Sequence, residues 1–303
     1  MIDLPSGVDI INLIDDLRIF SWEASETLLY YSRTLKDSNN KSNILENEDI
    51  EDPVTLADLK VNEIIIQRIS EKYKDIDWEI LSEENVKSGV GEVNTNANWT
   101  WVLDPLDGTK DFIQGTDNYA MHLALNFQRK SFIGIVLIPE KDELWITNGL
   151  NTWCERKDKS RKKIPPINKN KNLQDMVLVT SKNHGNEYLK TLIDKVNFKD
   201  VIVMGSIGCK IASILRGESD IYICFSLPGG SSPKDWDFAA PEAIIKAAGG
   251  AITNLDNEEL TYGNINYEQG GILVASNNKQ LHKLICSQIN EAIRKFGIYP
   301  IKD

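Results

Sequence analysis

The chain has 303 residues, of which 41% are hydrophobic and 26% are charged, and its formal net charge is −11. These values are typical of a globular protein with one large domain or two domains of ordinary size. The negative charge disfavours binding to a nucleic acid polymer, and no apolar run reaches the roughly 18 residues that a membrane helix needs. Residues 1–5 do not resemble a secretory signal and the four cysteines are scattered, so we expect a cytoplasmic protein with reduced thiols and no membrane partner.

The N-terminal part of the chain predicts two helices. Apolar residues recur at helical spacing from Asp9 to Leu35, which indicates a long amphipathic helix. The polar segment from Asp37 to Glu51 predicts a mobile loop or flap. Thr55 and Asp58 then have the spacing of a helix-capping pair, so a second helix is expected to run to about Tyr73.

The central part of the chain predicts strands. A short strand is expected from Trp78 to Leu81 and, after a polar loop, a buried apolar strand from Trp99 to Leu103. Three further strands have short connections, which favour antiparallel hairpins. These strands are Ala120 to Phe127, Phe132 to Ile138 and Leu144 to Thr147.

The basic, proline-containing segment from Lys157 to Asn172 marks the expected boundary between two halves, residues 1–165 and 166–303. Strands and helices alternate after this boundary, which predicts an α/β layer. Strands are expected at Met176–Thr180, Val201–Met204, Ile221–Phe225, Ala251–Thr253 and Gly271–Ala275. Helices are expected at Glu187–Val196, Cys209–Leu215, Asp237–Ala248 and Asn277–Phe296.

The most informative motif is Asp-Pro-Leu-Asp-Gly-Thr at residues 104–109, directly after a predicted buried strand. Asp104 and Asp107 are held close together, and two such carboxylates repel each other unless a cation lies between them. A hard divalent cation such as Mg²⁺ fits that position. Gly108 and Thr109 add backbone N–H groups and a hydroxyl, so this segment is expected to hold a metal ion and a phosphate group together.

Each acidic residue near this motif also has a structural interpretation. Asp58 and Asp237 lie at expected helix starts, where the helix dipole favours a negative charge, and Glu83 lies in a polar turn. For any one of these residues alone, the structural role is the more common. Asp104 and Asp107 do not fit it as well, because a rigid turn after a buried strand is a costly place for two unpaired charges.

Four segments of the chain together resemble the inositol monophosphatase superfamily in their order and spacing. They are Asp52–Asp58, Leu81–Glu84, Asp104–Thr109 and Trp236–Glu242. The resemblance covers nearly the whole chain and implies a layered α/β/α/β/α fold. It also implies an Mg²⁺-dependent phosphomonoesterase that uses two or three metal ions per site and is inhibited by Li⁺.

The same resemblance assigns roles to individual residues. The metal ligands that it implies are the carboxylates of Glu83, Asp104, Asp107 and Asp237 and the backbone carbonyl of Leu106. Asp58 and Thr109 would orient and deprotonate the attacking water. Gly108, Thr109 and Asp237 would also contact the substrate. These roles agree with the slow hydrolysis of phosphate monoesters, whose barrier must be lowered by charge neutralisation and positioning.

Within the superfamily, the second half of the chain resembles the 3'(2'),5'-bisphosphate nucleotidases. Lys210 follows the glycine-containing segment 205–209 and would meet a second phosphate, while Ser181, His184 and Ser206 are implied as further substrate contacts. The expected reaction converts 3'-phosphoadenosine 5'-phosphate to AMP and phosphate, which clears a by-product of sulfate activation. The partner is thus a small phosphate ester, and the protein is expected to be a monomer or a homodimer.

Three alternatives stay open at this point. An inositol monophosphatase or a fructose 1,6-bisphosphatase would use the same chemistry, and a metal-dependent binding module would not be an enzyme at all. Cys224 stands where some nucleotidases have an arginine and inositol monophosphatases an acid, which counts against inositol but leaves the adenine and ribose contacts undefined. Lone histidine and lysine side chains are commonly solvated, and this remains the structural interpretation of His184 and Lys210.

Overall fold

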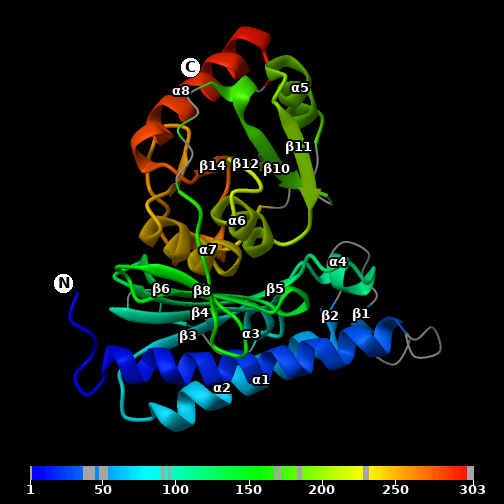
Figure 1. Ribbon diagram of the computed structural model, residues 1–303. Coiled ribbons are helices and arrows are strands. Elements are labelled where there is room, and N and C mark those ends of the chain that lie inside the picture. Colours follow the sequence, from blue (N-terminus) through cyan, green and yellow to red (C-terminus); the bar gives the residue numbers. More distant parts are fainter. Residues whose placement is uncertain are drawn as a thin grey trace.

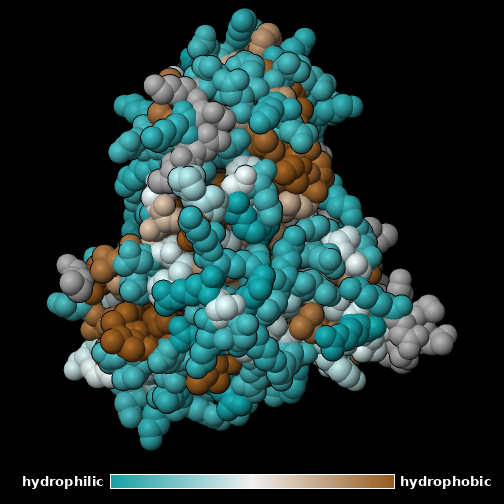
Figure 2. Space-filling model, in the orientation of Figure 1, coloured by the Kyte–Doolittle hydropathy of each residue, from teal (hydrophilic) through white to brown (hydrophobic). Residues whose placement is uncertain are grey.

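The computed structural model describes residues 2–36, 45–47, 54–89, 93–94, 97–166, 169, 172–182, 186–227 and 232–298. These residues form five layers in the order helix, sheet, helix, sheet, helix (Figure 1). The α/β/α/β/α arrangement that was expected from the sequence is therefore confirmed. The face of the molecule in Figure 2 is mostly hydrophilic, with separate hydrophobic patches.

The first layer consists of α1, Ile10–Lys36, and α2, Leu56–Lys72, which pack side by side beneath the larger sheet (Figure 1). The predicted capping pair is confirmed at the start of α2, where Thr55 Oγ1 accepts from the N–H of residue 57 and Asp58 accepts from Thr55 N. Beside these helices, β1, Leu45–Asn47, pairs with β2, Val54–Thr55. The rest of the predicted flap at residues 37–51 lies outside the described residues.

The second layer is a seven-stranded sheet with the strand order β3-β4-β5-β6-β7-β8-β9. β3 is parallel to β4, and all the other neighbouring strands are antiparallel. The sequence did not predict β8 and β9, which extend the sheet beyond β7. The strands are Glu79–Ser82, Trp99–Asp107, Ala120–Phe127, Lys130–Ile138, Glu143–Thr147, Thr152–Glu155 and Arg161–Lys162.

β4 is longer than the sequence predicted. Alternate residues of this strand contribute to the core between the sheet and α1 and α2, and to the core between the sheet and α6 and α7, so both of its faces are buried. The expectation that the strand ends at Leu103 is wrong, because it continues to Asp107, which pairs with Ala120. Its register shifts between Asp104 and Asp107, and Pro105, which has no N–H to donate, lies in this irregularity.

The third layer, between the two sheets, consists of α6, Ile207–Leu215, and α7, Asp235–Ala247 (Figure 1). α7 packs across β4, β5 and β6. At Gly134 of β6, an added Cβ would lie 2.7 Å from Ala240 O and 2.7 Å from Ala243 Cβ, so helix and sheet approach as closely as a glycine permits. α7 follows strands of the second sheet in the chain but packs on the first sheet.

The second sheet has the strand order β11-β10-β12-β14-β13, and α5 and α8 form the outermost layer on its far side (Figure 1). β10 is parallel to β11 and β12, whereas β14 is antiparallel to β12 and β13. Among the described helices, none has the length and apolar character required to span a membrane. The strands are Val177–Ser181, Asp200–Met204, Ile221–Phe225, Ala251–Asn254 and Ile272–Ser276, and the helices are Glu187–Val196 and Lys279–Phe296.

Candidate active site

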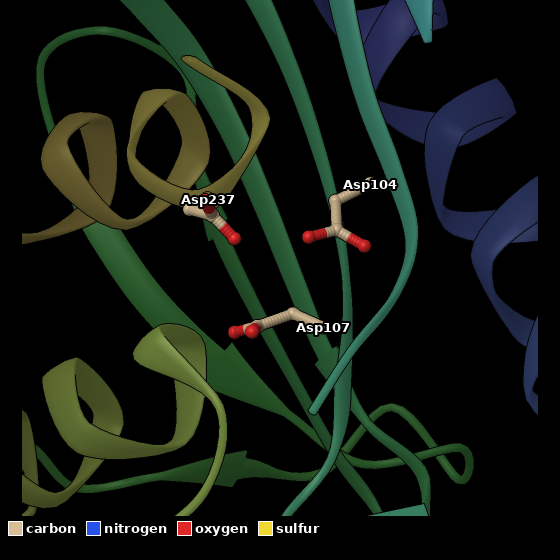
Figure 3. Close-up of side chains that lie close together, drawn as sticks. All are labelled: Asp104, Asp107 and Asp237. Atoms are coloured by element: carbon tan, nitrogen blue, oxygen red, sulfur yellow. The ribbon is translucent and has the colours of Figure 1, made fainter. Parts of the chain in front are cut away.

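Three aspartate side chains from two distant parts of the chain point toward one another (Figure 3). Asp104 and Asp107 come from the end of β4, and Asp237 comes from the first turn of α7. One carboxylate oxygen of each residue lies within 4.8 Å of the others. Packing of α7 on the first sheet therefore assembles a set of oxygen atoms of the kind that hard divalent cations bind.

The carboxylates of this cluster disfavour each other's charge. Burial, together with repulsion from Glu83, Asp107 and Asp237, raises the pKa of Asp104 well above its usual range. Burial and repulsion from Asp107 and Glu83 likewise raise the pKa of Asp237. A bound divalent cation would reverse this effect, because opposite charge favours the ionised carboxylate. The donors present thus fit a metal ion.

Two more of the predicted ligands lie beside the three aspartates. Glu83 begins α3, Glu83–Lys87, and its Oε1 lies 2.9 Å from Lys87 Nζ. It is not one of the three clustered carboxylates, but it contributes to the raised pKa values of Asp104 and Asp237. The Leu106 carbonyl accepts a hydrogen bond from the Thr109 hydroxyl at 3.0 Å.

Asp58 and Thr109, the predicted catalytic pair, are in contact between α2 and the start of the short helix that follows β4. Thr109 Oγ1 lies 3.4 Å from Asp58 Oδ1, while Asp58 Oδ2 accepts from Thr55 N at 2.8 Å and from Thr55 Oγ1 at 2.5 Å. Burial, aided by the charges of Glu84 and Glu83, raises the pKa of Asp58 to about 8. One carboxylate thus caps a helix with one oxygen and faces a hydroxyl with the other. A carboxylate with a pKa near neutrality is suited to accept a proton.

Gly108 turns the chain from β4 into α4, Thr109–Ile113. Its φ is +91°, and a Cβ at this position would lie 3.0 Å from Asn118 O and 3.2 Å from Ser206 N. A residue with a side chain would be both strained and crowded here. The glycine therefore lets the backbone that follows Asp107 approach the start of α6.

Asp107 is also hydrogen-bonded to the start of α6. Its Oδ2 accepts from Ser206 Oγ at 2.7 Å, Ile207 N at 2.5 Å and Gly208 N at 3.2 Å. Ser206 has a φ of +42°, which is unfavourable for a residue with a side chain, and its hydroxyl also accepts from Cys209 N at 3.1 Å. Ser206, which the resemblance implied as a substrate contact, thus donates to one carboxylate of the cluster.

Lys210 is buried, so its interpretation as a solvated lysine is wrong. The residue is 3% exposed, and its Nζ lies 5.4 Å from the centre of the Tyr222 ring. Burial lowers the pKa of Lys210, and attraction to Asp107 opposes this shift. Within the described part of the chain, no carboxylate forms an ion pair with its ammonium group.

Residues at the carboxyl ends of β10 and β12 surround the same tyrosine. Tyr222 is buried, and both Ser181 and Cys224 interact with its side chain. The two strands are parallel, which brings Ser181 and Cys224 to the same edge of the sheet. The structure thus brings Ser181 and Lys210 together around Tyr222. No sequence motif identified this tyrosine as part of the site. His184 lies outside the described residues.

The sequence also gave no functional role to His122. This residue is fully buried on β5, with Nε2 3.2 Å from Asp107 Oδ2 and Nδ1 3.4 Å from Trp236 O. Burial lowers the pKa of His122, and the charge of Asp107 acts in the opposite direction. The sequence feature that could have identified His122 is an ionisable residue within a strand that is otherwise almost entirely apolar.

Comparison with known proteins decides the family. The chain matches the inositol monophosphatase family over residues 18–294. The chain belongs to the inositol monophosphatase family. Membership in this family of phosphatases supports a phosphomonoesterase that acts on small phosphate esters, and the aspartate cluster is a site that can bind metal.

Several curated proteins are similar to this chain. The 3'(2'),5'-bisphosphate nucleotidase CysQ of Buchnera aphidicola is 34% identical over 215 residues, which cover 71% of this chain and 74% of that protein. Mouse 3'(2'),5'-bisphosphate nucleotidase 1 is 26% identical over 238 residues, covering 74% and 71%. The Nus factor SuhB of Vibrio cholerae is 29% identical over 249 residues, covering 79% and 83%.

Solved structures of the family share the fold. An inositol monophosphatase from Thermotoga maritima has a TM-score of 0.71 and 19% identity, over 94% of this chain and 100% of that one. The inositol monophosphatase from Anabaena has a TM-score of 0.69 and 21% identity, over 95% and 97%. At these identities the likeness establishes the layered fold and does not discriminate between substrates.

Proposed function

We propose that the protein is an Mg²⁺-dependent 3'(2'),5'-bisphosphate nucleotidase that converts 3'-phosphoadenosine 5'-phosphate to AMP and phosphate. The observation that carries this proposal is Lys210, a buried ammonium near the aspartate cluster that has no carboxylate partner among the described residues. A buried charge is costly unless an opposite charge accompanies it. A bisphosphate substrate brings one phosphate to the metal ligands and a second anion to this lysine.

The N-terminal part of the site would carry out the hydrolysis. Asp104, Asp107 and Asp237 would hold Mg²⁺, with Glu83 and the Leu106 carbonyl as further ligands. When bound, the metal ions would neutralise phosphate charge and make water a better nucleophile. Thr109, whose hydroxyl faces Asp58 Oδ1, would orient this water, and Asp58 would take its proton. Backbone N–H groups at Gly108 and Thr109 would hold oxygens of the phosphate.

The C-terminal part of the site would select the substrate. Lys210 would contact the phosphate that is not cleaved, and Ser181, beside Tyr222, would contact the nucleotide. Ser206, Asp237 and His184 remain predicted substrate contacts. The nucleotidases among the relatives support this choice, whereas the match to the inositol monophosphatase family keeps an inositol phosphate as the competing substrate.

A panel of three substrates tests the proposal. We expect kcat/KM with Mg²⁺ to be highest for 3'-phosphoadenosine 5'-phosphate and lower for fructose 1,6-bisphosphate and inositol 1-phosphate. EDTA should abolish turnover and Li⁺ should inhibit it. Faster release of phosphate from inositol 1-phosphate would contradict a nucleotidase. Metal binding without turnover of any of the three would instead favour a binding module.

A substitution of Lys210 tests the same proposal at one residue. Lys210→Met keeps the aliphatic stem and removes the charge. A charge-assisted contact contributes about 1.5–3 kcal/mol, so kcat/KM for the bisphosphate should fall roughly tenfold to hundredfold. A substrate with a single phosphate should be much less affected. Equal losses for both substrates would assign Lys210 to the common catalytic machinery or to folding.

A further inference from the structure

The two oxygens of Asp107 have different surroundings. Oδ2 accepts from Ser206 Oγ and from two backbone N–H groups at the start of α6. No donor in the described part of the chain contacts Oδ1. Figure 3 shows the carboxylate of Asp107 extending into the space beside α6 and α7, near Asp104 and Asp237. One oxygen of Asp107 is therefore anchored by the protein, and the other is available to a metal ion.

His122 lies against the anchored oxygen from the side of the sheet. It pairs with Asp104 in the register of β5 and β4, and its Nε2 lies 3.2 Å from Asp107 Oδ2. This contact is close but is not a well-directed hydrogen bond, and no described atom gives the fully buried nitrogen such a bond. The 3.2 Å contact with Asp107 is thus the polar contact that the structure gives this nitrogen.

The position of the imidazole ring is fixed by close packing. A Cβ on Gly208 would lie 2.2 Å from Nε2 and 2.7 Å from Val136 Cγ1, so α6 approaches the ring closely only because residue 208 is a glycine. On the other side, Nδ1 lies 3.4 Å from Trp236 O at the start of α7. His122 therefore contacts α6, α7 and the end of β4 at the point where these three elements meet.

We propose that His122 is a positioning residue that holds Asp107 Oδ2 against the start of α6 and so directs Oδ1 toward the metal ion. This inference rests on the proposed metal-dependent phosphatase site. A carboxylate whose orientation is fixed before the metal binds loses less rotational freedom on binding. Groups that orient metal ligands in this way typically contribute a factor of 10–100 in metal affinity or activity.

His122 is not itself suited to be a metal ligand. Oδ2 of Asp107 already accepts three hydrogen bonds from residues 206–208, and a cation between this oxygen and Nε2 would have to displace them. The clustered ligand atoms come from Asp104, Asp107 and Asp237 and do not include the imidazole. The three donors on α6 move with that helix, whereas His122 belongs to the sheet that carries Asp107.

Two substitutions of similar length separate the polar contact with Asp107 from packing. In His122→Gln, the side-chain amide can reach the position of Nε2 and donate to Asp107, whereas His122→Met fills similar space without a donor. Binding of Mn²⁺ to metal-free protein is measured by isothermal titration calorimetry, with no substrate present. We expect His122→Met to weaken Mn²⁺ binding about 10–100-fold and His122→Gln to stay within about threefold of the wild type.

Control proteins make the outcomes distinct. His282→Gln replaces a buried histidine on α8, outside the site, and should leave Mn²⁺ affinity unchanged. If His122→Met does not fold, as judged by urea unfolding in EDTA, His122→Asn takes its place, because its shorter amide cannot reach the position of Nε2. Wild-type affinity in the donor-free variant, or equal losses with Gln and Met, would overturn the inference alone. A wild-type protein that binds no Mn²⁺ would overturn the proposed metal centre as well.

Discussion

Asp104 and Asp107 are three residues apart in the chain but have different roles in the metal-free fold. We expect Asp104→Asn and Asp107→Asn each to lower kcat/KM with Mg²⁺ by at least about a hundredfold, because both remove charge that the cation needs. Their effects on stability in EDTA should have opposite signs. Burial and neighbouring carboxylates raise the pKa of Asp104, whereas Asp107 accepts three hydrogen bonds from residues 206–208.

The surroundings of Asp104 and Asp107 predict the sign of each change in stability. At neutral pH, Asp104→Asn replaces a carboxyl group whose charge the folded state disfavours, so it should raise the free energy of unfolding. Asp107→Asn weakens charge-assisted hydrogen bonds and should lower it by about 1–3 kcal/mol. Urea unfolding in EDTA at pH 7 measures both values, and changes of the same sign would contradict this account.

We expect His282 to make the stability of the protein depend on pH. Its Nε2 lies 2.8 Å from Thr253 Oγ1 and its Nδ1 lies 2.8 Å from Ser276 Oγ, and burial lowers its pKa from 6.5 to about 4. The unfolded chain therefore binds a proton more readily than the folded one between these two pH values. The free energy of unfolding should fall as pH drops through this window, by about 3 kcal/mol from this residue.

A variant isolates the contribution of this histidine from that of other titrating groups. His282→Gln should be less stable than the wild type at pH 7, because it loses well-placed hydrogen bonds, but its stability should fall less steeply from pH 6.5 to pH 4. The difference between the two urea-unfolding curves, measured at several pH values, gives the slope. Parallel pH profiles would show that His282 does not titrate as inferred.

The packing of α7 on β6 decides where one carboxylate of the cluster lies. In Gly134→Ala, the new Cβ would lie 2.7 Å from both Ala240 O and Ala243 Cβ, so helix and strand must separate. We expect a loss of about 1–3 kcal/mol in the free energy of unfolding and weaker Mn²⁺ binding, because α7 carries Asp237. Gly270→Ala is the matched control, since its nearest atom, Ser232 Oγ, would be 3.5 Å away.

Elements with a clear hydrophobic pattern were predictable from the sequence, and elements formed by pairing were not. The helix Glu187–Val196 and the strands Ala120–Phe127 and Ile221–Phe225 have the predicted bounds. β8 and β9 are short and partly polar, and they form because β7 offers an edge with which they can pair. The extension of β4 past its proline likewise depends on β5, which no local pattern encodes.

The residues of the candidate site likewise fall into a group that the sequence predicted and a group that it did not. Asp104, Asp107 and Asp237 were predicted from motifs, and the structure brings their carboxylates together. His122 and Tyr222 were not, because their places beside Asp107 and Lys210 follow from strand register and helix packing rather than from neighbours in the sequence. The assigned roles of the site residues stay predictions that the experiments above address.

At the scale of the whole molecule, metal binding should stabilise the fold. The clustered carboxylates come from β4 and α7, so the unfolded chain offers no such cluster. A cation present at a hundred times its dissociation constant should raise the free energy of unfolding by about 2.7 kcal/mol. Urea unfolding with Mg²⁺ and with EDTA measures this increment, which Asp237→Asn should largely remove. An equal increment in that variant would place the binding site elsewhere.

The position of Asp237 late in the chain has a consequence for protein synthesis. A ribosome makes β4 well before α7, so the first sheet can begin to form while one of the three clustered aspartates is still missing. A nascent chain, or a fragment that ends before α7, therefore lacks a complete cluster whatever the metal concentration. If the proposed activity holds, hydrolysis would arise only after the third layer has docked, and incomplete chains would not consume phosphate esters.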